Sequence, residues 1–372
     1  MNNCDSPKSI FTREKILING SLFIALILLT VYMLLRKNDI NEIISIIFNI
    51  NKKYILIGIF CMFIFIFCEA LNIRRSLKIF GYKINKLSCL KYALVGFFFS
   101  SITPSATGGQ PMQVYYMHKD KISMGHSTIA LLMDLASYQF ITVFLAIIGL
   151  IFQHSLLSES LDRIKYLLLI GVTINTLALV IILIGIFSKN LMPKIIDIVV
   201  FVLRKINYKK VDKIKCYLLN NVKEYKESAV YFKKNKLTVI KILITSLFQM
   251  VALNSIPFWI YKSFGLEGYS IINVILLQSV LFITVSALPL PGSVGVSESG
   301  FMIMYKTLFP KQLLSSAMLL SRGVSFYLCL LISGAILATI YLFAMMQVNK
   351  YVTVKERRVG NNTDLKNTCS RR

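Results

Sequence analysis

The sequence predicts an all-α polytopic membrane protein, because of its composition and its long uncharged segments. Hydrophobic residues make up 56% of the 372 positions, charged residues only 16%, and the mean hydropathy is +0.66. Soluble domains average about 45–50% apolar and about 25% charged residues. Several uncharged segments reach the ~20 residues with which a helix crosses the hydrocarbon core. The whole chain, 1–372, is therefore expected to be a single integral membrane domain.

Six segments have the length and hydrophobicity of complete transmembrane helices. They are 16–35, 54–73, 127–152, 166–187, 242–261 and 323–346. The first has a basic flank like that of a signal peptide. Its apolar run is longer than a usual signal-peptide core, however, and it ends in "RKND" rather than at a small-residue cleavage site. We therefore expect it to be a retained helix.

The lysines and arginines predict that both termini of a cell-membrane protein lie in the cytoplasm. With the N-terminus inside, 32 of the 42 basic residues fall in cytoplasmic segments, nine fall outside, and Arg322 lies within the membrane. The same distribution explains most of the net charge of +25, so nucleic acid is not required as a direct partner. Two cytoplasmic segments are strongly basic: 188–236, which has an amphipathic helical pattern, and the tail 347–372.

Two further hydrophobic segments, 90–116 and 271–309, contain helix-breaking motifs. These motifs are "TPSATGGQP" at 103–111 and "LPLPGSVGVSE" at 288–298. Non-helical backbone is tolerated at membrane depth only when it is buried in protein or lines a wet cavity. Both segments are therefore predicted to be re-entrant hairpins. They would enter from opposite faces, as in an inverted repeat with a substrate site where the two halves meet.

Four charged residues lie in or beside predicted membrane segments: Glu69, Asp134, Glu298 and Arg322. A charge near the bilayer centre costs at least ~2.5–3.5 kcal/mol, so such residues usually face a cavity or a partner. For Glu69 and Arg322, a position near the interface is an equal alternative. An ion pair between Asp134 and Arg322 is one arrangement that would join the two halves.

The predicted substrate path combines the two motifs with these charges. Its residues are Thr103, Pro104, Ser105, Thr107, Gly108, Gly109, Gln110, Asp134, Pro289, Pro291, Gly292, Ser293, Gly295, Glu298 and Arg322. The sequence contains no C-x-x-C, H-E-x-x-H, G-x-S-x-G or Walker motif, and its three histidines lack ligand spacing. We therefore expect no catalytic residue of the usual kinds, no metal and no cofactor.

Taken together, the paired motifs resemble the membrane domain of lysylphosphatidylglycerol synthases. The resemblance rests on "TPSATGGQPMQVYYM" followed by Asp134, and on "LPLPGSVGVSESG" followed by Arg322, and it spans residues 10 to 346. The family also includes standalone flippase-like proteins and archaeal glycosylation-associated relatives. This chain departs from the common pattern at Ala106-Thr107 and at Gln110, which flank the glycine pair, and at Ser293 after Gly292.

The resemblance implies a role in lipid metabolism and in resistance to cationic peptides. In two-part members, a soluble domain transfers lysine to phosphatidylglycerol, and the membrane domain moves the product to the outer leaflet. Only the membrane part is matched here, which favours a translocase. The implied partners are membrane lipids: an anionic or aminoacylated phospholipid, or a lipid-linked sugar. A separate cytoplasmic synthase is a further candidate partner, and the sequence leaves the oligomeric state open.

Two alternatives to the translocase remain. The first is a phosphatidylglycerol lysyltransferase or another lipid-modifying transferase, with Glu298 or Asp134 as acid or base. The second is a non-catalytic membrane protein that binds a separate synthase through its basic loop.

Overall fold

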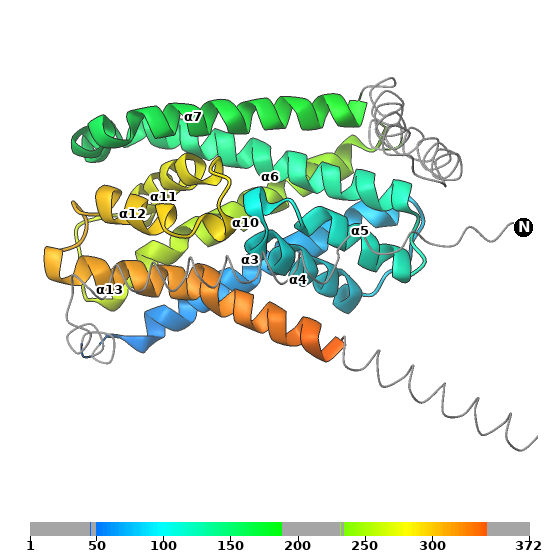
Figure 1. Cartoon of the computed structure of the whole chain (residues 1–372), viewed down its shortest axis with the longest axis horizontal. Helices are drawn as coiled ribbons and strands as arrows, with labels where there is room; N and C mark the ends of the chain where they lie inside the picture. Colours follow the sequence, from blue (N-terminus) through cyan, green and yellow to red (C-terminus); the bar gives the residue numbers. More distant parts are fainter. Residues whose placement is uncertain (1–44, 46–49, 188–230, 232–233, 341–372) are drawn as a thin grey trace, which may run out of the picture.

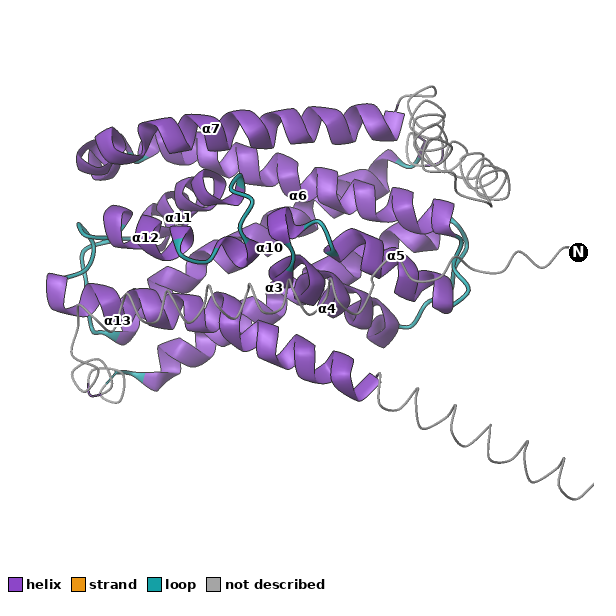
Figure 2. Ribbon diagram, viewed as in Figure 1, coloured by secondary structure: helices purple, strands orange, loops and turns teal. Residues whose placement is uncertain are grey.

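The structure confirms an all-helical membrane protein. The computed structural model describes residue 45, residues 50–187, residue 231 and residues 234–340. In these residues the chain forms helices and connecting loops, and no strand (Figure 2). Five helices are long and apolar enough to cross a membrane: Lys52–Ile79, Met124–Phe152, Lys165–Ile186, Lys236–Ser263 and Lys311–Ile340. The predicted span 16–35, the tail 347–372 and most of the basic segment 188–236 lie outside the described residues.

The long helices follow the sequence predictions closely. They are α3 (Lys52–Ile79), α6 (Met124–Phe152), α7 (His154–Phe187) and α10 (Lys236–Ser263). Polar residues begin two of them: Asn51 accepts a hydrogen bond from the amide of Lys53, and Ser123 accepts one from the amide of Gly125. α10 contains Pro257 without a break in its helical assignment.

The last span begins earlier than predicted. The sequence suggests a start at 323, but α13 runs from Lys311 to Arg322 and continues through a π-helical turn, η3 (Gly323–Tyr327), to Ile340. Arg322 interrupts the uncharged run, and for this reason the hydropathy pattern places the boundary too late. The structure pairs this charge with Glu298, so the helix continues through it.

Each predicted hairpin is a pair of short helices separated by one 3₁₀ turn. The first pair is α4 (Lys86–Ile102) and α5 (Gly109–Lys119), joined through η1 (Pro104–Ala106). The second is α11 (Ile271–Ser286) and α12 (Val296–Met304), joined through η2 (Pro291–Ser293). Each of these helices is shorter than the ~20 residues of a complete crossing. Re-entry from the membrane surface stays a prediction that these lengths favour.

The two hairpins approach each other from opposite ends of the bundle, as Figure 1 shows, and η1 contacts η2. At one end, Asn51 of the α3 N-cap donates a hydrogen bond to Ser263 of α10, and Phe264 packs against Phe309. At the other end, Tyr82 contacts His126. The two helix breaks therefore meet between the two ends of the bundle, and Ser105, Ala106 and Thr107 of the first break are exposed.

The two halves repeat with a constant spacing. Pro104, Gly109 and Met124 begin η1, α5 and α6, and Pro291, Val296 and Lys311 begin η2, α12 and α13. Each pair is 187 residues apart (291 minus 104, 296 minus 109, 311 minus 124). Since the corresponding hairpins start at opposite ends, the arrangement is that of an inverted repeat.

Candidate functional site

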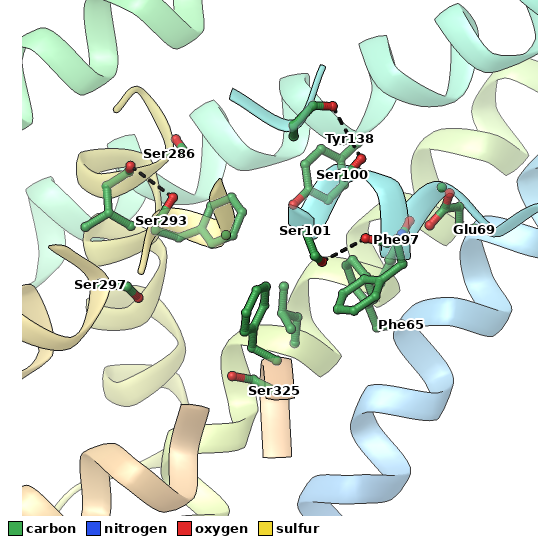
Figure 3. A pocket seen from close by; sticks show the side chains of 18 of the residues that line it. Phe65, Glu69, Phe97, Ser100, Ser101, Tyr138, Ser286, Ser293, Ser297 and Ser325 are labelled. Carbon is green, nitrogen blue, oxygen red and sulfur yellow. Dashed lines mark hydrogen bonds between the residues drawn. The ribbon is translucent and has the colours of Figure 1, made fainter. Parts of the chain in front are cut away.

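A cavity of about 360 Å³ with a mixed polar and apolar lining lies where the two breaks meet. Its walls come from both halves: α3, α4, η1, α5 and α6 on one side, and α10, α11, η2, α12 and α13 on the other. In Figure 3, Glu69 from α3 lies across the cavity from Ser286, Ser293 and Ser297 of the second hairpin. Serine, glutamine and acidic side chains share this lining with aromatic rings. A mixed lining of this kind suits a ligand with both polar and apolar parts.

The predicted path residues divide into two groups. Those that line the cavity are Ser105, Gln110, Asp134, Gly292, Ser293 and Arg322. Those that do not line it are Thr103, Pro104, Thr107, Gly108, Gly109, Pro289, Pro291, Gly295 and Glu298. Apart from Asp134 and Arg322, the residues of both groups belong to the two broken segments. Residues of the second group mainly determine the backbone conformation of the two breaks, which form part of the cavity wall.

Threonine hydroxyl groups form hydrogen bonds with backbone carbonyl and amide groups at the first break. Thr103 donates to the carbonyl of Phe99 (2.6 Å) and accepts from the amide of Gly108 (2.9 Å). Thr107 donates to the carbonyl of Pro104 at 2.9 Å. These bonds replace helical partners that Pro104 and the turn remove, because unsatisfied backbone groups at membrane depth are costly. Thr103 and Thr107 thus satisfy backbone groups where α4 stops between the ends of the bundle.

Glycine allows the close packing around this break. A Cβ added to Gly109 would lie 2.0 Å from the Ser100 hydroxyl oxygen and 2.9 Å from the Gly96 carbonyl oxygen. A methyl group does not fit there without displacing the backbone of α4. The glycine pair therefore brings α5 against α4, with Gln110 and Gln113 turned toward the cavity.

Positive φ angles mark the second break. Gly292 has a φ of +58° and Ser293 has a φ of 51°, just as Ser105 and Ala106 have φ angles of 51° and 54° at the first. Gly295, also at positive φ, precedes α12, and its amide donates to Glu298 Oε2 at 2.6 Å. Glu298 is therefore both the acceptor at the start of α12 and a buried charge.

Arg322 forms an ion pair with Glu298, with a distance of 2.9 Å between Nε and Oε1. Its Nη2 donates to the carbonyl of Gly292 (3.0 Å), and its guanidinium stacks over Phe326 at 4.4 Å from the ring centroid. Tyr327 donates a further hydrogen bond to Glu298. The suggested pair between Asp134 and Arg322 is thus not formed: Arg322 pairs within its own half, where Glu298 begins the neighbouring helix.

The opposite side of the cavity carries two carboxylates, Glu69 and Asp134. Gln113 Nε2 donates to Glu69 Oε1 at 2.8 Å, and Asn72 Nδ2 donates to Asp134 Oδ1 at 2.9 Å. Glu69 therefore faces the cavity, and its depth relative to the membrane interface stays a prediction. The two halves differ in charge: one presents an arginine held by a glutamate, and the other presents two acids.

Sequence reasoning left several polar lining residues out of the predicted path. They are Glu69, Ser100, Ser101, Gln113, Tyr138, Gln249, Gln278, Ser286, Ser297, Ser321 and Ser325. The glutamines lie in otherwise apolar helices, and that position was a usable signal for Gln249 and Gln278. The serines gave no such signal, because serine bonds its own helix backbone and occurs throughout membrane helices.

A metal site is not apparent in the part of the chain that the structure describes. There, no three histidine, cysteine, aspartate or glutamate side chains come together as ligands. The cavity groups are amides, hydroxyls, two acids and one arginine. This set can bind ammonium, hydroxyl and phosphate groups through hydrogen bonds and charge.

Comparison with known proteins identifies the family. The family described as "Lysylphosphatidylglycerol synthase TM region" matches residues 17–333. Similar proteins include a UPF0104 membrane protein of Archaeoglobus fulgidus, 25% identical over 85% of this chain and 92% of that protein. Another, from Methanocaldococcus jannaschii, is 25% identical over 78% of this chain and 85% of its own length. A third, from Pyrococcus horikoshii, is 22% identical over 82% of this chain and 92% of its own length. The chain is thus a multi-pass membrane protein that belongs to the lysylphosphatidylglycerol synthase transmembrane-region family.

Proposed function

We propose that this protein translocates a phospholipid or a lipid-linked headgroup between membrane leaflets. The observation that carries the proposal is the cavity with charged and polar side chains between two helix breaks that come from opposite ends of the bundle. In transporters built from inverted repeats, substrates bind near the midplane, where broken helices meet. A polar headgroup needs such a path because the hydrocarbon around the protein offers it no hydrogen-bond partner.

The charges in the cavity favour a headgroup that carries both a cation and a phosphate. Glu69 and Asp134 supply negative charge on one wall, and Arg322 supplies hydrogen-bond donors on the other. Coulomb attraction is several times stronger in such a site than in bulk water. The planar guanidinium of Arg322 suits phosphate oxygens, and the two acids suit an ammonium group. A zwitterionic or aminoacylated phospholipid has both groups.

The size of the cavity also fits the proposal. A volume of about 360 Å³ is at the lower end of the range of about 300–1,000 Å³ that small-molecule pockets occupy. The cavity is therefore large enough for a headgroup but not for a whole phospholipid. The acyl chains would remain along the outer surface, where Phe60, Phe63 and Phe67 of α3 are exposed.

The test is leaflet-specific lipid labelling in proteoliposomes that contain the purified full-length chain. Fluorescent phosphatidylethanolamine and phosphatidylglycerol serve as probes, and a membrane-impermeant quencher reports which leaflet each probe occupies. We expect Asp134→Asn to slow translocation of the amine lipid about tenfold or more, which corresponds to ~1.4 kcal/mol of lost stabilisation. The matched control is Asp120→Asn, because Asp120 lies outside the cavity lining.

Two results would contradict the proposal. One is that wild-type protein leaves every probe in its original leaflet. The other is that the purified protein, given lysyl-tRNA and phosphatidylglycerol, forms a new lipid. This second result would favour the lipid-modifying transferase.

A further inference from the structure

Glu69 and Asp134 form an acidic pair that lacks a balancing cation in the described part of the chain. Both carboxylates line the same cavity, one from α3 and one from α6. Each accepts a hydrogen bond from a neutral amide, of Gln113 and Asn72 respectively. The ion pairs among the described residues are Lys91–Asp120, Lys262–Glu267 and Arg322–Glu298, and none of them involves this acidic pair.

Among the residues that the structure describes, the neighbouring elements supply no positive charge to the acidic pair. Arg75, on α3, donates instead to the backbone carbonyl of Lys241 and to the hydroxyl of Thr245. Arg322 is held by Glu298 across the cavity. The other titratable groups that interact with the two acids are the neutral side chains of Cys68 (α3), Tyr138 (α6) and Cys329 (after η3). α10 contributes Ser246 and Gln249, which carry no charge.

Two ionised carboxylates in this position would be expensive. Each charge at membrane depth costs at least ~2.5–3.5 kcal/mol, and like charges that share a site repel one another. Binding of one proton removes both the repulsion and part of the desolvation cost. Intramembrane acids that carry protons in pumps and transporters occupy environments of this kind.

Two buried acceptors beside the pair lack a donor. Asn72 Oδ1 and Gln249 Oε1 have no hydrogen-bond partner, and their residues are only 0% and 2% exposed. The amide nitrogen of Asn72 already donates to Asp134 Oδ1. A proton on the other oxygen of Asp134 would supply the donor that Asn72 Oδ1 lacks, as in a reciprocal acid–amide pair. An unpaired buried acceptor is unfavourable, so this proton stabilises the site.

Gln249 provides an independent sign that the cavity binds a hydrogen-bond donor. Its side chain lines the cavity, and its oxygen is buried without a hydrogen-bond partner in the protein. A small rotation of this side chain would let an ammonium group in the cavity donate both to this oxygen and to the carboxylates. The same acids would thus serve either a proton or an ammonium group.

We propose that Glu69 and Asp134 are a proton-binding site, with the proton held by Asp134 against Asn72, and that a cationic headgroup displaces this proton when it enters the cavity. The proton leaves to water as the cation enters, so charge stays balanced in the exchange. This inference rests on the proposed function and adds a way to couple lipid movement to a proton gradient. The direction of lipid transport is not part of the inference.

Infrared difference spectroscopy of the purified full-length protein in detergent tests the proton site without any lipid transport. The carbonyl stretch of a protonated carboxylic acid is separate from carboxylate bands. At neutral pH we expect this band to correspond to about one proton per chain. Asp134→Asn should remove the band. Asn72→Leu keeps Asp134 but removes the hydrogen bond to it, so this variant should shift the frequency of the band. Glu267→Gln is the control and should leave the band in place, because Glu267 is 87% exposed and lies outside the cavity lining.

Displacement is measured by addition of short-chain phosphatidylethanolamine to weakly buffered protein with a pH-indicator dye. We expect proton release from wild type and none from Asp134→Asn, whereas short-chain phosphatidylglycerol, which has no amine, should release none. Sodium chloride at equal concentration should also release none, and release by sodium would identify a metal-cation site instead. Absence of the protonated-acid band in wild type and in Asn72→Leu overturns the inference.

The two proposals fail separately. Lipid translocation that is independent of a pH gradient across the proteoliposome would overturn the coupling and leave the translocase standing. A clear protonated-acid band in a protein that moves no lipid would overturn the translocase and leave the proton site standing.

Discussion

Arg322 shows how a single buried charge holds the second half together. Its guanidinium contacts Glu298 at the start of α12, the carbonyl of Gly292 in η2 and the ring of Phe326 in η3. Side chains of both charged residues are largely buried, with exposures of 14% for Arg322 and 5% for Glu298. A buried pair adds little stability relative to an apolar pair, but removal of one partner leaves an isolated charge. The pair therefore fixes the geometry of the break more than it strengthens the protein.

Glu298→Gln and Arg322→Gln should each destabilise the protein by about 3–5 kcal/mol, because each leaves an unpaired charge in a buried site. The double variant should lose clearly less than the sum of the two, since it leaves no charge behind. Thermal unfolding of the detergent-purified variants measures both effects. Glu267→Gln is the control, because Glu267 is 87% exposed in its ion pair and should change stability little. Additive losses would show that the two residues act separately.

At the scale of elements, the first hairpin depends on a contact between its two ends. Lys91 of α4 forms an ion pair with Asp120 at the C-cap of α5 (2.6 Å), and the Tyr92 hydroxyl donates to the same carboxylate. Burial raises the pKa of Asp120, but the hydrogen bonds from Lys91 and Tyr92 and the nearby positive charges outweigh burial and hold the pKa below its usual value. The contact therefore keeps α4 and α5 together while Asp120 is ionised.

The stabilising effect of Asp120 should depend on pH. A carboxylate whose pKa is lower in the folded than in the unfolded protein stabilises the fold above the unfolded pKa of about 3.9, and this stabilisation is lost as the pH falls through the folded value. Asp120→Asn should thus lower stability at pH 7 by about 1 kcal/mol or less, since the pair is partly exposed and screened. Thermal unfolding at pH 7 and at about pH 3 should show this difference shrinking in acid. An equal difference at both pH values would exclude a role for the charge.

The sequence predicted these elements well where a single local signal decides the outcome. Proline, glycine and hydroxyl residues located both breaks, because the turn at η1 and the positive φ at Gly292 depend on nearby residues. The start of α13 was missed because Arg322 looks like a helix boundary in a hydropathy pattern. The partner of Arg322 and the orientation of Glu69 were not predictable, since both depend on which helices become neighbours in the folded bundle.

Close backbone packing was also invisible in the sequence. A Cβ at Gly171 would lie 2.4 Å from the carbonyl oxygen of Ile283, and one at Gly149 would lie 2.7 Å from that of Leu276. These two glycines let α7 and α6 approach the backbone of α11. Small residues at helix interfaces are typical of membrane proteins, but the sequence alone does not show which glycine meets which helix.

At the scale of the whole molecule, the cavity lies between two repeated halves that carry different charges. The two halves share the positions of their breaks and helix starts, but acids of α3 and α6 face the cavity from one half and Arg322 from the other. The two halves thus have similar backbones but contribute side chains of opposite charge to one site. A headgroup bound between them would contact both halves, so movement of one half against the other would change its access to water.

The same arrangement predicts on which side of the membrane each hairpin opens. Lys86 begins α4 at one end of the bundle, Glu267 precedes α11 at the other, and both are exposed. The end that holds Lys86 also carries Arg74, Lys78, Lys83 and Lys121, and basic loops stay in the cytoplasm. In a variant without native cysteines, Lys86→Cys should react with a membrane-impermeant maleimide only after the cells are opened. Glu267→Cys should react in intact cells, because its end carries fewer basic residues. Labelling of both positions in intact cells would show that the hairpins open to the same side, contrary to an inverted repeat.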